Sequence, residues 1–237
     1  MVKFKIKWFG VFCSIIFSSC NKTEIQPGYA SIYITFQYTF GSHQSLQWDS
    51  LLYVTCNQDT ISFSRLEYIL SNFAFYSKGK IYKQKGSFYI NPKENKNIVK
   101  IDSVLGINYD SISFTIGDNH LQGIYDIDIM SMFWPDMMGG GYHFLKLEGY
   151  YTHNTMKMGY AMHAGGFPLS PIKYTLKCPI TISHLSHTLT LNHKLDKWFD
   201  GTSCYKVSSY NYSMGVDSLM IKILQNGKFC INFLQFK

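Results

Sequence analysis

Side chains that can bind a soft metal ion gather in the middle of this sequence. Seven of its ten methionines lie between residues 130 and 162, and His163 follows directly. A thioether is a soft ligand that suits Cu(I), and imidazole suits copper in either oxidation state. The pattern therefore predicts a copper site in this segment. The candidate ligands are His163 first, and then His143, Met132 and Met137.

The same residues also have a purely structural interpretation. Methionine is flexible and fills irregular gaps in protein cores. His143 alternates with Leu145 and Leu147, as expected of a core histidine with a hydrogen-bonded ring. His163 precedes two glycines, which allow a ligand or another backbone to approach closely. Trp134 lies beside the cluster, where a core aromatic with a partnered indole N–H would also fit. The sequence leaves both interpretations open.

Alternating apolar residues predict the elements that must position these groups. The two-residue rhythm is clear at 31–38 and 112–116, and it recurs in 142–149, 156–163, 172–178 and 187–193. Many short strands separated by turns, together with 17% aromatic residues, favour an all-β fold. We expect a single β-sandwich of mostly antiparallel strands over residues 30–237.

Three segments carry more local expectations. Residues 66–75 fit either a strand or a brief helix. Residues 194–200 fit a single helical turn closed by Gly201. The pair Asn226-Gly227 is typical of a tight hairpin, so two final strands are expected over residues 219–236.

The N-terminus has the order of a bacterial lipoprotein signal. Three lysines precede an apolar run over residues 8–17, and Ser18-Ser19-Cys20 follows. The run is too short to span a bilayer, which favours a cleaved signal peptide. We expect residues 1–19 to be removed, Cys20 to carry lipid, and residues 20–29 to form a tether. The protein would then sit in the bacterial cell envelope, anchored to a membrane on its periplasmic or outer face. An ordinary secretory signal is the alternative.

Four cysteines remain after Cys20, and they suggest disulfides. An exported domain with an even number of cysteines is typically cross-linked. Close Cys-x-x-Cys spacing, which would indicate zinc, is absent. Two disulfides with an open pairing are therefore expected among Cys56, Cys178, Cys204 and Cys230.

Charge and motifs narrow the function classes. The formal net charge is +7, but the basic residues are scattered, so nucleic acid is not an expected partner. Nucleophile elbows, phosphate loops and His-Glu-x-x-His motifs are missing, which favours a binding protein over an enzyme. An adhesion or glycan-binding sandwich without metal is the alternative, because tyrosine rings stack on sugars. Its candidate residues are Tyr150, Tyr151, Tyr210 and Tyr212.

Five elements in a constant order resemble the MbnP-like family of copper-binding lipoproteins. One lies in the middle of the chain, where Met132-Phe133-Trp134 leads to Gly141–Gly149 within the segment 132–149, and His163-Ala164-Gly165-Gly166 comes next. Upstream elements are Ser64–Tyr68 with Ser71-Asn72, and Ile112–Gly117; a late element is Lys197–Gly201. The chain departs from the pattern with Tyr38 in place of a first-strand histidine, and with Asp136 in place of a second tryptophan.

The resemblance implies an extracytoplasmic β-sandwich that binds copper for uptake, storage or handling. Members are commonly paired with a dihaem, peroxidase-like partner that can oxidise a tryptophan of the copper protein. Trp134 occupies the matching position. The resemblance therefore implies a redox modification of Trp134, with the oxidising chemistry supplied by the partner.

Overall fold

The computed structural model describes residues 28–43, 45–118, 121, 126–138, 140–153, 155–166 and 168–237. The expected signal peptide, the lipidated Cys20 and all but two residues of the tether lie outside these ranges. No helix among the described residues combines the length and the apolarity needed to cross a membrane.

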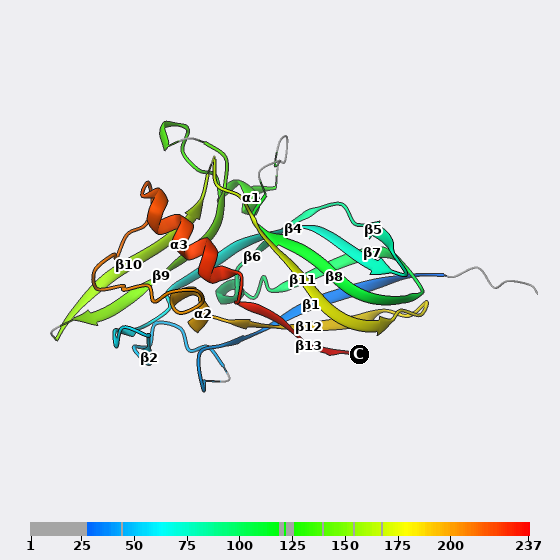
Figure 1. The fold of residues 1–237 in the computed structure, drawn as a ribbon, viewed down its shortest axis with the longest axis horizontal. Helices are drawn as coiled ribbons and strands as arrows, with labels where there is room; N and C mark the ends of the chain where they lie inside the picture. Colours follow the sequence, from blue (N-terminus) through cyan, green and yellow to red (C-terminus); the bar gives the residue numbers. More distant parts are fainter. Residues whose placement is uncertain are drawn as a thin grey trace, which may run out of the picture.

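Strands make up most of the described chain (Figure 1). In chain order they are β1 (Tyr29–Thr39), β2 (Tyr53–Val54), β3 (Thr60–Ile61), β4 (Arg65–Ser77), β5 (Lys80–Lys83), β6 (Ser87–Ile90), β7 (Ile98–Leu105), β8 (Asn108–Ile116), β9 (His143–His153), β10 (Met156–Gly165), β11 (Ile172–Thr181), β12 (His187–Lys194) and β13 (Ile231–Phe236). The helices are α1 (Ile127–Met130), α2 (Asp196–Phe199) and α3 (Asp217–Gly227), with 3₁₀ turns η1 (Pro92–Glu94) and η2 (Asp136–Met138).

The strands form two sheets. The smaller sheet has the order β13-β12-β1-β7, and the larger runs β11-β8-β4-β9-β3-β2, with β10 paired to β9 and both β5 and β6 paired to β4. Among the described strands, β1 and β12 pair in parallel and the other pairings are antiparallel. This arrangement confirms the predicted all-β sandwich.

The core lies between the two sheets and is rich in aromatic rings. On β1, Ile32, Ile34 and Phe36 are buried, as the two-residue alternation predicts. The ring of Phe36 meets that of Tyr68 on β4 edge to face, with centroids 6.1 Å apart. Burying one such side chain contributes about 1.5–3 kcal/mol. The strand β4, ambiguous from its sequence, is thus held in the large sheet by core contacts.

The segment expected to be a terminal hairpin is instead the helix α3. Met220, Ile223 and Leu224 have the i, i+3, i+4 spacing of one helix face, and all three are buried. The hairpin prediction at Asn226-Gly227 is wrong because tertiary contacts use both residues. The Asn226 amide accepts and donates backbone hydrogen bonds in the 198–203 segment. A Cβ at Gly227 would lie 2.4 Å from the Trp198 ring.

One of the two expected disulfides is present. Cys56 is bonded to Cys204 across 148 residues of sequence. The prediction is wrong for Cys178 and Cys230, which are free and buried. Burial raises the pKa of the Cys178 thiol to about 11 and that of Cys230 well above its usual value. An even number of cysteines does not reveal where each one lies in the fold. Cys178 lies on β11, and Cys230 directly precedes β13.

Candidate functional site

The hairpin of β9 and β10 brings two histidines together. The regular register pairs His163 with Lys146, and a shift between Ala164 and Gly165 then sets Gly165 opposite His143. The two imidazole rings lie 5.2 Å apart, nearly perpendicular to each other at 88°. The two histidine ligand candidates therefore share one site, although 20 positions separate them in the sequence.

The glycines after His163 allow this close packing. Gly165 and Gly166 have φ angles of +148° and +75°, which L side chains rarely adopt. A Cβ at Gly165 would lie 2.5 Å from the carbonyl oxygen of Tyr142, and one at Gly166 would lie 3.1 Å from the Trp134 indole. That buried indole in turn packs on the ring of His143, with centroids 4.4 Å apart. The site is thus a dense group of His143, His163 and Trp134.

His143 has one nitrogen engaged and one free. Its Nδ1 lies 3.0 Å from the carbonyl oxygen of Met132. A carbonyl oxygen only accepts, so Nδ1 carries the proton and Nε2 keeps its lone pair. That Nε2 is buried and has no hydrogen-bond partner. Burial lowers the pKa of His143 to about 4, which keeps the ring neutral.

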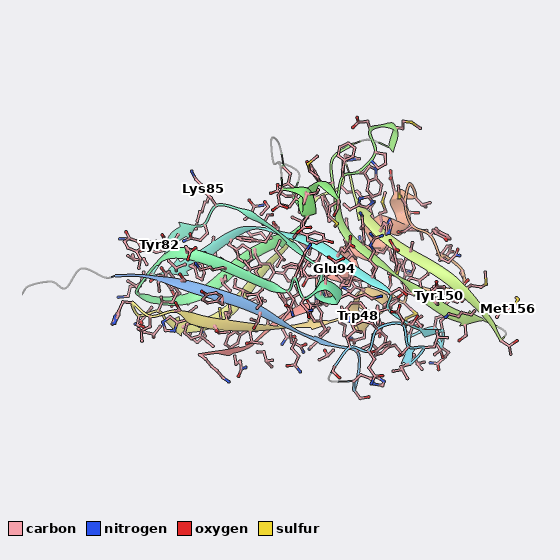
Figure 2. The ribbon with its side chains drawn as sticks, turned by 180° about the vertical axis from the view of Figure 1, so that it is seen from behind. Trp48, Tyr82, Lys85, Glu94, Tyr150 and Met156 are labelled. Carbon is pink, nitrogen blue, oxygen red and sulfur yellow. A yellow bond between two sulfur atoms is a disulfide. The ribbon has the colours of Figure 1, made fainter. Side chains whose placement is uncertain are left out.

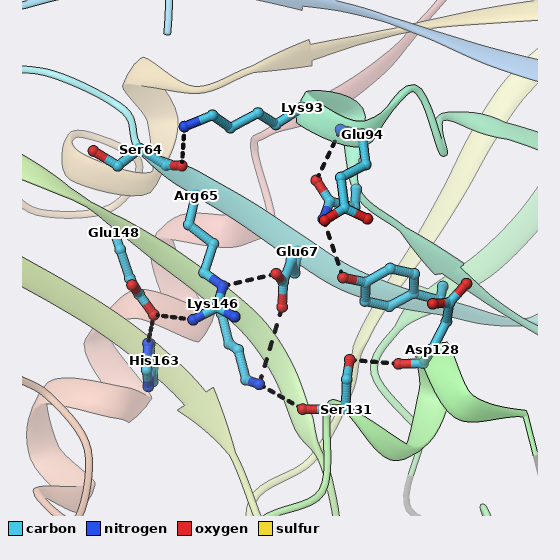
Figure 3. Close-up of polar contacts among 12 residues, drawn as sticks. Ser64, Arg65, Glu67, Lys93, Glu94, Asp128, Ser131, Lys146, Glu148 and His163 are labelled. Atoms are coloured by element: carbon cyan, nitrogen blue, oxygen red, sulfur yellow. Dashed lines mark hydrogen bonds and ion pairs between the residues drawn. The ribbon is translucent and has the colours of Figure 1, made fainter. Parts of the chain in front are cut away.

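His163 shows the same arrangement with its nitrogens exchanged. Its Nε2 lies 2.8 Å from Oε1 of Glu148, while its Nδ1 is buried without a partner (Figure 3). The hydrogen bond from His163, together with the Arg65 guanidinium, lowers the pKa of Glu148 to about 2. The ionised carboxylate therefore accepts a hydrogen bond from the Nε2–H of His163. Metal-binding histidines in proteins almost always donate their second N–H to such a partner.

A row of alternating charges supports Glu148 from β4. The register pairs Arg65 with Glu148 and Glu67 with Lys146. Arg65 Nε lies 2.7 Å from Glu67 Oε1, and its Nη1 lies 3.0 Å from Glu148 Oε1 (Figure 3). Lys146 donates to the carbonyl oxygen of Ser131 at 2.7 Å, and burial lowers its pKa. All four residues belong to motifs of the sequence, but the sequence alone assigns them no role; the signal that could have found them is opposite charge at paired strand positions.

The methionine candidates do not join the histidines. The side chain of Met132 packs in a separate small core with Ile69, Leu121 and Ile129, and only its backbone carbonyl reaches His143. Met137 is 99% exposed. Within the described residues, no group of three or more His, Cys, Asp or Glu side chains is arranged to hold a metal ion. The metal donors that the structure brings together here are two imidazoles.

Further candidates from the sequence lie on the surface or in the core. Figure 2 shows Met156 at the tip of the β9–β10 hairpin, with Tyr150 also on that hairpin. Tyr150, Tyr210 and Tyr212 are exposed, as the glycan-binding alternative requires. The prediction that Tyr151 is exposed is wrong, because its ring is buried and its hydroxyl contacts the sulfur of Met158.

His193 provides an internal comparison, since it is fully buried but both of its ring nitrogens are engaged. The indole N–H of Trp198 donates to its Nε2 at 2.9 Å, so Nδ1 carries the proton and lies 3.4 Å from the Tyr68 hydroxyl. That hydroxyl is 3.0 Å from the one of Tyr38. His193 is therefore a satisfied core histidine, in contrast to His143 and His163.

Acid should weaken the fold through His193. Burial lowers its pKa from 6.5 to about 3, so below pH 6.5 the unfolded chain binds a proton that the folded chain does not. The contribution of neutral His193 to the free energy of unfolding is complete above pH 6.5. Between pH 6.5 and about pH 3 it falls by about 1.4 kcal/mol per pH unit on acidification. Urea unfolding measures the free energy of unfolding of the native chain and of His193→Gln near pH 7 and near pH 5. Between these two pH values the native chain should lose about 2 kcal/mol more than His193→Gln. Equal losses would contradict the assignment.

Comparisons with known proteins place the chain in a family. A family model described as MbnP matches residues 29–219. Among solved structures, MbnP from Methylosinus trichosporium is similar, with 10% sequence identity, a TM-score of 0.47, and coverage of 74% of this chain and 79% of that one. No curated protein matches. Because the family model covers most of the sequence, the chain belongs to the MbnP family.

Proposed function

We propose that this protein binds copper between Nε2 of His143 and Nδ1 of His163, as a membrane-anchored copper-binding protein outside the cytoplasm. The observation that carries the proposal is the pair of buried, unpartnered ring nitrogens on two imidazoles in contact. Copper here is cargo for uptake, storage or handling. The protein would bind it without catalysing a reaction of its own.

The chemistry of the two nitrogens favours a cation. Leaving a buried acceptor without a partner costs about 1–3 kcal/mol. Here two neighbouring rings, with centroids 5.2 Å apart, each carry one such acceptor. Their other nitrogens are held by the Met132 carbonyl and the Glu148 carboxylate, so both lone pairs remain available. Imidazole suits both oxidation states of copper, and copper exceeds the other divalent first-row metals in affinity for such donors. Membership of the MbnP family supports the same choice.

Anchoring and redox chemistry complete the proposal. The N-terminal sequence supports a lipid anchor on Cys20 and a place in the bacterial envelope. A dihaem, peroxidase-like partner would oxidise Trp134, whose indole contacts the ring of the proposed ligand His143. This contact gives the modification a route to affect the metal site, because a changed ring would repack against His143.

A copper titration tests the proposal. The chain from residue 21 onward is loaded with Cu(I) without oxygen, against a competing chelator, and separately with Cu(II) followed by electron paramagnetic resonance. We expect one tightly bound copper ion per chain, with nitrogen hyperfine coupling for Cu(II), and weaker binding of Zn(II). Failure to bind one equivalent more tightly than micromolar would refute the proposal.

A further inference from the structure

We propose that Arg65 is a positioning residue, which holds the Glu148 carboxylate so that His163 presents Nδ1 at a fixed place. The inference concerns the orientation of one imidazole in the metal-free protein. Its consequence for affinity rests on the proposed copper function. Arg65 acts only through Glu148, because His163 Nε2–H donates to the Glu148 carboxylate and Arg65 Nη1 donates to the same oxygen.

Glu148 needs such support because its surroundings leave it partly free. Its side chain is 28% exposed, whereas that of His163 is only 13% exposed. The same oxygen, Oε1, accepts from both His163 Nε2 and Arg65 Nη1. Without the guanidinium, the carboxylate would gain solvent contacts and rotamers that do not meet the ring.

Arg65 is itself fixed from the other side. Its Nε donates to Oε1 of Glu67, a side chain that is 7% exposed and lies beside Lys146. The planar guanidinium thus bridges one buried carboxylate and one partly exposed carboxylate (Figure 3). Lysine could not replace it, because an ammonium lacks this rigid fork. The order of support runs from Glu67 through Arg65 and Glu148 to the His163 ring.

The backbone of His163 is also held by hydrogen bonds, so the orientation of its ring is the part that Glu148 can control. The hydroxyl of Ser213 accepts from the His163 N–H at 2.8 Å and donates to its carbonyl oxygen at 2.6 Å. Rotation about the Cβ–Cγ bond would exchange the place of Nδ1 with that of Cδ2, and the place of Nε2 with that of Cε1. A fixed carboxylate selects one of these two orientations.

The test compares Arg65→Met and Glu148→Gln with the native chain and with Lys100→Met. Lys100→Met breaks an exposed ion pair with Asp102, 2.9 Å long, on the other sheet. Long-range ¹H–¹⁵N correlations of the metal-free proteins report which ring nitrogen of His163 carries the proton. Copper titrations of the same proteins report affinity.

We expect one Nε2–H form in the native chain and in Lys100→Met. Both site variants should show mixed or exchanging forms of His163, with copper affinity lowered by about 10–100-fold. A single Nε2–H form with native copper affinity in both site variants would overturn the inference. If Arg65→Met fails to fold, Arg65→Lys decides, because it keeps the positive charge and lacks the planar fork; a single Nε2–H form with native copper affinity in Arg65→Lys would then overturn the inference. If the native chain binds no copper, the proposed function fails, while the metal-free spectra still decide the positioning role.

Discussion

Replacing His143 or His163 by glutamine should lower copper affinity by more than about 100-fold, and replacing both should abolish stoichiometric binding. The reason is that each imidazole would supply one of the two ligand nitrogens of the proposed site, since each carries a buried ring nitrogen without a partner and the two rings are in contact. Loss of a ligand should exceed the roughly 10–100-fold loss that follows from removing a ligand's hydrogen-bond partner. Competition titrations with Cu(I) measure the effect directly.

Matched methionine variants separate this site from the one expected from the sequence. Met132→Leu and Met137→Leu remove thioethers that the structure places in a separate core and on the surface. Both variants should bind copper with native affinity. If the histidine variants kept native copper affinity and the methionine variants lost it, methionine sulfur and not imidazole would be the copper ligand.

Removing the disulfide by Cys56→Ser with Cys204→Ser should lower the free energy of unfolding by about 5 kcal/mol. The bond closes a loop across 148 residues, and such a long loop loses much conformational entropy in the unfolded chain when it is cross-linked. It joins the segment between β2 and β3 to the one that leads into α3. Guanidinium unfolding, monitored by tryptophan fluorescence, measures the change.

Reduction of the native chain provides the control for this prediction. A reductant should destabilise the native chain and have no effect on the double serine variant. Cys178→Ala should keep the full response to reductant, because its thiol is free. A difference below about 1 kcal/mol between oxidised and reduced native chain would show that the unfolded state is already compact in this region.

The charge row next to the histidines also explains why the site could be found only in part from the sequence. A strand pattern places Lys146 and Glu148 on one face of β9, and Arg65 and Glu67 on one face of β4. Which acid faces which base depends on the register between two strands whose paired residues, Arg65 with Glu148 and Glu67 with Lys146, are 83 and 79 positions apart. The sequence alone therefore assigns no role to Glu148 and Arg65.

By itself, the sequence determined most of the strands and the sandwich. These follow from local rules, because a two-residue period is a property of short segments. The family was indicated separately, by the order of five motifs along the chain, and the family model shows it. The tertiary structure alone decided that His143 meets His163, that Met132 contributes a carbonyl oxygen, that α3 replaces a hairpin, and that Cys56 pairs with Cys204. Each of these outcomes depends on contacts between distant segments, and packing in the core selects them over the local preferences.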